Sequence, residues 1–160
     1  MYKRQGKDTH GILRQHQFDK IEMFCFVTPE ESVAEHERIL ATEEEILTGL
    51  DIPYRVLNIP VWDLGNPAAK KYDCEAWLPG QGAYRELTSC SNTTDYQAAR
   101  LNIRVRTPGG NRNLHTLNGT ACAMGRTIIA LLENGQDDNG VVHLPETLVR
   151  YGAPATIAKA

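Results

Sequence analysis

The chain has 160 residues, of which 41% are hydrophobic and 23% charged, and its formal net charge at pH 7 is -3. This composition is typical of one globular domain, and it excludes a fibrous, collagen-like or largely disordered protein. No apolar run approaches the roughly 18 residues that span a bilayer, and residues 1–19 lack the apolar segment of a signal peptide. We therefore expect no membrane association and a cytoplasmic location.

The charges are unevenly distributed along the chain. Residues 28–51 contain eight acidic side chains and one arginine, whereas residues 96–132 contain five arginines and no acidic residue. An acidic helix usually presents a solvated face, but arginines without carboxylates favour an anionic partner such as phosphate or nucleic acid. Arginines scattered over the surface are the alternative interpretation.

The four cysteines are Cys25, Cys74, Cys90 and Cys122. They are far apart in the sequence, lie in apolar or strand-like segments and form no Cys-x-x-Cys pair. We expect small buried hydrophobic residues rather than a zinc site or a disulfide framework.

The first half of the chain predicts a strand, a helix and a second strand. Residues 17–28 alternate and then become apolar, as in a strand that enters a core. Thr28-Pro29-Glu30-Glu31 is a capping-box sequence with proline at the first helical position, so we expect a helix from Thr28 to about Gly49. The next expected elements are a strand over residues 54–59, a turn over 63–67 and a short helical turn over 68–71.

The second half predicts two hairpins and a long helix. The expected elements are strands 72–78 and 83–90 joined by the loop 79–82, strands 101–106 and 113–117 around Pro108-Gly109-Gly110, and a helix over 120–134. Hairpins with a long helix near each end favour an α+β fold with an antiparallel sheet. We expect one domain over residues 1–152 and a flexible tail over 153–160.

The segment Asn118-Gly119-Thr120 is expected at the start of the last helix, where free N–H groups bind anions. Gly119 would let a ligand approach the backbone, and Asn118 and Thr120 would hold a small polar group. A plain turn and helix cap is the alternative. Arg126 follows among apolar residues with no acid within a helical turn, so it needs a partner from elsewhere.

Two further clusters carry polar side chains. Strand alternation predicts Glu86 and Thr88 on one face, with Arg85, Leu87 and Ser89 on the other. A carboxylate and a hydroxyl there would bind Mg²⁺ together with substrate phosphates, although a solvated cross-strand pair is the alternative.

Phe18 offers a stacking surface, and Glu22 follows four residues later. Together, these clusters indicate a site for a metal-bound anionic nucleotide and a small polar partner.

Five segments in order resemble seryl-tRNA synthetases, which are class II aminoacyl-tRNA synthetases. These are residues 11–22, similar to the later half of motif 2, then 69–79, 84–92 and 115–120, and finally 125–134, similar to motif 3. The resemblance implies the C-terminal part of the class II antiparallel catalytic sheet. It also implies a ligase that joins L-serine to ATP and passes the seryl group to the 3′ end of tRNA(Ser).

The resemblance also implies roles for individual residues. Phe18 would stack on adenine and Gln15 would contact it through its backbone, while Glu86 and Ser89 would bind Mg²⁺ and the ATP phosphates. Leu87 and Thr88 would complete that ATP-binding strand.

Arg126 would be the motif 3 arginine near adenine and the γ-phosphate, and with Glu86 it would be catalytic. The serine pocket would consist of Glu22, Asn118 and Thr120.

Departures from the family pattern lead us to expect a fragment that is incomplete alone. Residues 1–10 do not contain the Phe-Arg-x-Glu sequence of motif 2, and motif 1, through which the family forms homodimers, has no counterpart. Trp62 stands where the family prefers glycine, and Ala99 where it has arginine. A non-catalytic relative that binds ATP and serine, and a ligase that loads a carrier protein, are the alternatives.

Overall fold

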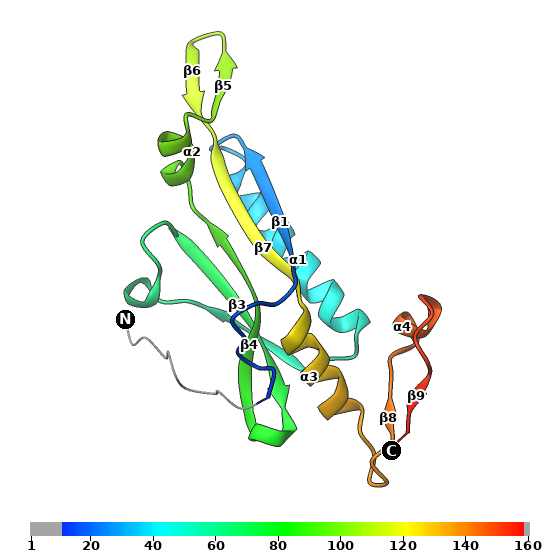
Figure 1. Cartoon of the computed structure of the whole chain (residues 1–160). Helices are drawn as coiled ribbons and strands as arrows, with labels where there is room; N and C mark the ends of the chain where they lie inside the picture. Colours follow the sequence, from blue (N-terminus) through cyan, green and yellow to red (C-terminus); the bar gives the residue numbers. More distant parts are fainter. Residues whose placement is uncertain (1–10, 159–160) are drawn as a thin grey trace.

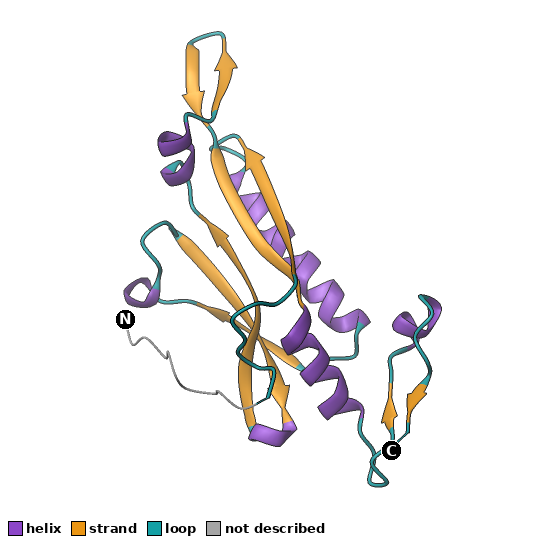
Figure 2. Ribbon diagram, in the orientation of Figure 1, coloured by secondary structure: helices purple, strands orange, loops and turns teal. Residues whose placement is uncertain are grey.

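The computed structural model describes residues 11–158, and its centre is a five-stranded sheet in the order β1-β7-β4-β3-β2 (Figures 1 and 2). All four neighbouring pairs are antiparallel, which confirms the predicted α+β class. The strands are β1 Lys20–Val27, β2 Tyr54–Asn58, β3 Lys70–Leu78, β4 Ala83–Asn92 and β7 His115–Ala123.

Helices and two small strand pairs complete the described part of the chain. The helices are α1 Ser32–Gly49, α2 Tyr96–Leu101, α3 Met124–Gly135 and α4 Glu146–Arg150, with short 3₁₀ turns at Val61–Asp63 and Pro79–Gln81. The strand pairs are β5 Arg104–Thr107 with β6 Gly110–Asn113, and β8 Val142–His143 with β9 Thr156–Ile157. Within residues 11–158, no helix combines the length and the apolar character that a membrane crossing requires.

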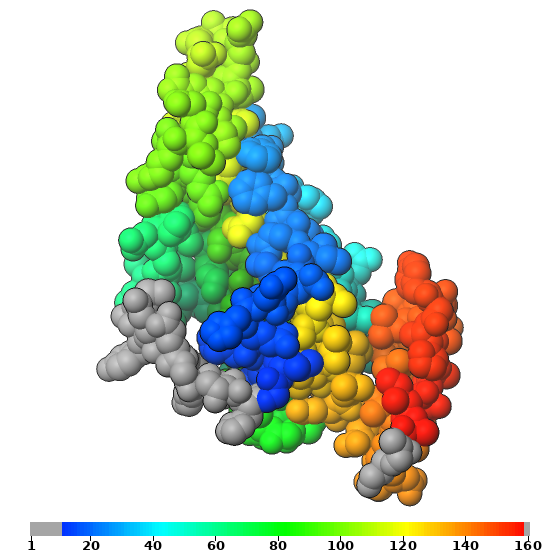
Figure 3. Space-filling view, in the orientation of Figure 1, coloured from blue at the N-terminus to red at the C-terminus, as the bar shows by residue number. Residues whose placement is uncertain are grey.

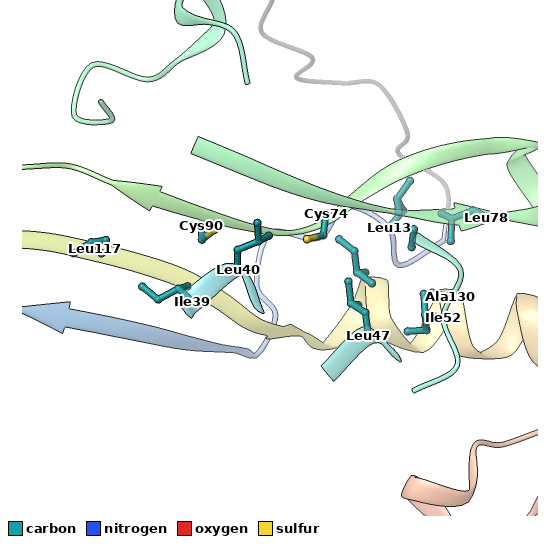
Figure 4. Packing of buried hydrophobic residues seen from close by; sticks show 12 residues of the cluster. Leu13, Ile39, Leu40, Leu47, Ile52, Cys74, Leu78, Cys90, Leu117 and Ala130 are labelled. Carbon is teal, nitrogen blue, oxygen red and sulfur yellow. The ribbon is translucent and has the colours of Figure 1, made fainter. Parts of the chain in front are cut away.

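Helix α1 covers one face of the sheet, which we call the closed face (Figure 1). Ile39 and Leu47 of this helix are in the same buried cluster as Cys74, Cys90 and Leu117 from three strands, and Figure 4 shows these side chains together. Burial of such apolar surface supplies most of the favourable free energy of folding. All four cysteines are free thiols; Cys74 and Cys90 are buried as predicted, whereas Cys25 and Cys122 are only partly buried.

A carboxylic acid is buried in this apolar contact. Glu43 of α1 has no exposed surface, although the acidic helix was expected to be solvated. Its Oε2 accepts a hydrogen bond of 2.9 Å from the Thr88 hydroxyl and lies 3.6 Å from Cys74 Sγ, whereas its Oε1 has no hydrogen-bond partner. Burial raises the pKa of Glu43 to about 7, because desolvation disfavours the carboxylate.

The predicted start of α1 is partly correct. The Glu31 carboxylate accepts hydrogen bonds from the backbone N–H and the hydroxyl of Thr28, so one half of the capping box forms. The regular helix begins at Ser32, one turn later than its sequence indicated.

Several predicted elements differ from the structure. The second hairpin consists of residues 104–107 and 110–113, not 101–106 and 113–117. Residues 68–71 form no helical turn, because Lys70 and Lys71 pair with β4 as the first residues of β3. Helix α2 was not predicted. Asn118-Gly119-Thr120 lies inside β7, and the last helix begins at Met124 instead of residue 120. Within the expected tail 153–160, residues 156–157 form β9.

Candidate active site

The second face of the sheet, which we call the open face, carries a cavity of about 280 Å³. Residues 11–18 form one wall as they pass in front of the sheet (Figure 3), and β4, the end of β7 and the start of α3 form the others. The predicted site residues that line it are Gln15, Phe18, Glu86, Leu87, Thr88, Ser89, Thr120 and Arg126.

A β-bulge in β4 determines which residues reach the cavity. On β3, Cys74 pairs with Thr88 but the next residue, Glu75, pairs with Glu86, so Leu87 is an extra residue in β4. The predicted alternation is therefore wrong. Directly paired residues share a face, and Asp73 and Glu75 are two apart, so their partners Ser89 and Glu86 lie on the same face.

The bulge sends the two intervening residues the other way. Leu87 and Thr88 are both buried, at 4% and 2% exposure, and the Thr88 hydroxyl donates to Glu43 on the closed face. Thr88 therefore belongs to the cavity wall while its hydroxyl is already engaged behind the sheet.

Arg126 was expected to need a partner from elsewhere in the chain, and this partner is Glu86. Its guanidinium donates to the backbone carbonyl of Glu86, and Nη1 lies 3.7 Å from the Glu86 carboxylate. Lys71 Nζ lies 3.9 Å from the same carboxylate and 2.7 Å from Asp73. Of these four side chains, Arg126 and Glu86 line the cavity, whereas Lys71 and Asp73 do not. Burial raises the pKa of Asp73, mainly through desolvation.

The predicted serine-binding residues form one hydrogen-bonded cluster across β1 and β7. Glu22 Oε1 accepts from the Asn118 amide at 3.0 Å, and Oε2 accepts from the Thr120 hydroxyl at 3.2 Å. Lys20 Nζ lies 2.6 Å from the same carboxylate. Asn118 and Thr120 therefore share one face of β7, and strand pairing brings Glu22 to them; the predicted helix N-terminus has no part in this cluster.

Gly119 lies between these two residues, and the side on which a Cβ atom would project faces α1. A Cβ atom there would overlap Ile39 Cγ2 and lie 2.8 Å from Glu43 Oε1. The glycine that suggested a turn is needed because the helix approaches the strand closely.

Phe18 and Gln15 project from the segment that covers the cavity. The Phe18 ring is half exposed, at 52%. The segment also passes close to the start of α3, because a Cβ atom on Gly125 would lie 3.1 Å from the Ile12 carbonyl oxygen and 3.3 Å from Gln15 Oε1.

A second hollow of about 580 Å³ adjoins the first and shares Arg14, Glu86 and Arg126 with it. Trp62, which is 83% exposed, belongs to its lining. Lys71 and Asp73 were not predicted as site residues. Their spacing of two along β3, which places both on one face of the sheet, was the signal in the sequence. Among the residues that the structure describes, no three His, Cys, Asp or Glu side chains converge as metal ligands.

The arginine-rich stretch does not converge on the cavity. Arg126 alone reaches it, whereas Arg112 pairs with Glu30 at 2.6 Å and Arg100 lies over the Tyr96 ring at 3.5 Å. Arg104 and Arg106 belong to the distant β5–β6 hairpin.

Comparison with known families decides the assignment of this fold. Residues 1–135 match the family model described as the tRNA synthetase class II core domain (G, H, P, S and T). The chain belongs to the class II tRNA synthetase core domain family. Two relatives, both named serine--tRNA ligase, are from Streptomyces coelicolor and Thermococcus kodakarensis. Each alignment covers 91% of the chain with 58% identity.

Solved structures give the same result. Seryl-tRNA synthetase from Pyrococcus horikoshii, complexed with ATP, superimposes on 98% of this chain with a TM-score of 0.94 and 52% identity. Cytoplasmic serine-tRNA ligase from Naegleria fowleri, in complex with AMP, covers 96% with a TM-score of 0.88 and 43% identity. The chain spans about a third of the length of these relatives, from 32% to 37%.

Proposed function

We propose that this chain is the ATP- and serine-binding part of a seryl-tRNA synthetase. The complete reaction would join L-serine to the α-phosphate of ATP, release pyrophosphate and pass the seryl group to tRNA(Ser). The observation that carries the proposal is the Glu22 carboxylate, held by Asn118 and Thr120 beside a cavity that also contains Phe18 and Arg126. This arrangement suits a small hydroxylated amino acid next to a nucleotide.

The cavity offers a nucleotide both a flat surface and positive charge. We assign Phe18 to stacking on the adenine and the backbone of Gln15 to its edge. Arg126 would bind phosphate and offset the negative charge that develops on the pyrophosphate leaving group. No side-chain nucleophile is needed, because bringing the serine carboxylate in line with the α-phosphate supplies much of the rate acceleration.

Glu86 and Ser89 fit the requirements of Mg²⁺. Both are oxygen ligands, and the bulge places both on the open face. With only these two protein ligands, phosphate oxygens and water would complete the coordination shell. When bound with ATP, the ion would neutralise phosphate charge. Glu86 would then contact the ion in place of Arg126.

Selection of serine over alanine would follow from Glu22. Its carboxylate oxygens each have a further lone pair that can accept a hydrogen bond from the serine hydroxyl, which alanine lacks. A hydrogen bond to a charged group contributes about 1.5 to 3 kcal/mol, which would favour serine by roughly tenfold or more.

The remaining parts of the proposal concern the whole synthetase. They are the acceptor end of tRNA(Ser) as second substrate, the homodimer and the cytoplasmic location. The domain boundary at residue 152 stays a prediction.

Nucleotide binding and exchange test the proposed function. We expect the chain to bind ATP with Mg²⁺ in calorimetry, and the Arg126→Ala variant to bind it roughly tenfold to a hundredfold more weakly, because a charged hydrogen bond to phosphate is lost. Arg100→Ala is the matched control, since Arg100 is exposed and stacks on Tyr96 away from the cavity. Equal affinities of the two variants would contradict the assignment of Arg126.

Serine-dependent exchange of pyrophosphate into ATP then separates the alternatives. ATP binding without exchange, on the chain and on a full-length version alike, would favour a non-catalytic relative. Exchange followed by serine transfer to a carrier protein but not to tRNA would favour the carrier-loading ligase.

A further inference from the structure

The β5–β6 hairpin presents a surface with two arginines and two asparagines, which we call the arginine face. Arg104 pairs with Asn113 and Arg106 with Asn111, and directly paired residues lie on one side of a two-stranded ribbon. Arg104, Arg106 and Asn111 are all exposed. Arg112 pairs with Val105 and therefore lies on the opposite side.

The charges of the arginine face are largely uncompensated. Arg106 has no hydrogen bond or ion pair with any residue from 11 to 158, and Arg104 donates only to the Asn102 side chain, at 3.3 Å. Asp95 is the carboxylate at the base of the hairpin, 3.4 Å from the Asn113 amide. Arg112, by contrast, is neutralised by Glu30. The two faces of one hairpin thus differ sharply in free positive charge.

The hairpin projects from the end of the sheet that lies away from α3 (Figures 1 and 3). It precedes β7, whose nine residues run from the hairpin to the cavity, a distance of roughly 25 Å along the strand. ATP and serine cannot reach across this distance. Only a ligand longer than this distance could contact both places, and the free arginines favour an anionic one.

We propose that the arginine face binds the phosphate backbone of the RNA whose 3′ end is acylated at the cavity, a proposal that rests on the proposed function. Arginine forks match phosphate oxygens, and the Asn111 amide can both donate to and accept from ribose hydroxyls. The contacts position the RNA and add affinity without reading sequence.

RNA binding by charge-matched double variants tests this surface. We expect Arg104→Gln with Arg106→Gln to weaken binding of a tRNA(Ser) transcript by roughly tenfold to a hundredfold at about 0.1 M salt, measured by fluorescence anisotropy. The slope of log affinity against log salt should fall by about 0.7 to 0.9 for each arginine removed. Serine-dependent pyrophosphate exchange should not change, so a failure of the proposed function would show separately.

Arg100→Gln with Arg112→Gln is the control, because it removes the same charge outside the arginine face. It should change RNA affinity less than about threefold, the effect of net charge alone. Equal losses in the two double variants, or no binding by the unaltered chain, would overturn the proposal. So would unchanged RNA affinity with an altered sedimentation coefficient, since the face would then contact protein. All four positions are exposed, and an unchanged thermal midpoint verifies folding.

Discussion

The two faces of the sheet use neighbouring residues of the same strands for opposite purposes. On β7, Asn118 and Thr120 face the open side with polar groups directed to Glu22, whereas Gly119 faces α1 with no room for a methyl group. On β4, Ser89 belongs to the cavity and Thr88 donates to Glu43 behind the sheet. The positions of the polar groups on the open face therefore depend on the packing that holds the strands on the closed face.

The largest expected effect comes from the closed face. Gly119→Ala places a methyl group against Ile39 and Glu43, and overpacking of this kind costs about 3 kcal/mol of unfolding free energy. Urea denaturation measures the loss. Gly49→Ala is the control, because a Cβ atom at the end of α1 meets nothing within 4 Å. Equal stabilities of the two variants would mean that α1 does not press on β7.

Glu43 gives the next effect, through pH. Its folded pKa of about 7 exceeds the ordinary value of 4.5, so the folded state binds more protons than the unfolded state between these values. Stability is therefore full below pH 4.5 and falls as pH rises through 7, by a total of roughly 2 to 3 kcal/mol. Several groups surround this carboxyl: Glu22 and Asp73 act on it by charge, Thr88 and Cys74 contact it, and His36 is buried on the same helix.

The Glu43→Gln variant should abolish this part of the pH dependence, because the amide is neutral throughout. Unfolding free energies measured at about pH 5 and about pH 8 give the slope, and Glu45→Gln on the exposed side of α1 should leave it unchanged. An unaltered slope in Glu43→Gln would mean that the carboxyl is already ionised at low pH.

The smallest effect on stability is expected on the open face. Asn118→Ala removes one hydrogen bond at a partly exposed site and should cost less than about 1 kcal/mol. Serine affinity should nevertheless fall by roughly tenfold, since Glu22 loses the amide that orients it. Asn113→Ala, which removes an amide bonded to Asp95 on the hairpin, is the matched control in serine titrations. A loss of stability as large as that of Gly119→Ala would erase the distinction between the faces.

The sequence predicted those elements that are marked by turn or capping residues within a short stretch of chain. The loop 79–82 contains glycine and proline, and its hairpin forms where expected. A hairpin also forms around Pro108-Gly109, but its second strand is residues 110–113 and not 113–117. Asn118-Gly119-Thr120 has the same local character, yet it lies in a strand, because the glycine is required by Ile39 and Glu43, more than 70 positions earlier in the sequence. Helix α2 has no side-chain cap, so no capping residue indicated this helix in the sequence.

The candidate site divides in the same way. Phe18, Glu86 and Arg126 could be named from the sequence through the family resemblance. The contact between Arg126 and Glu86 joins residues 40 positions apart, and strand pairing joins Glu22 to Asn118 across 96 positions, so neither follows from a local pattern. Fold topology alone brings these groups together.

The bulge at Leu87 makes the cavity depend on the number of residues in β4 as well as on their identity. Glu86 and Ser89 are three positions apart, a spacing that an ordinary strand would divide between its two surfaces. A homologue lacking one residue between them would have a spacing of two, which an ordinary strand places on one surface without a bulge. A homologue that kept the spacing of three but paired without the bulge would instead turn one of the two groups toward α1.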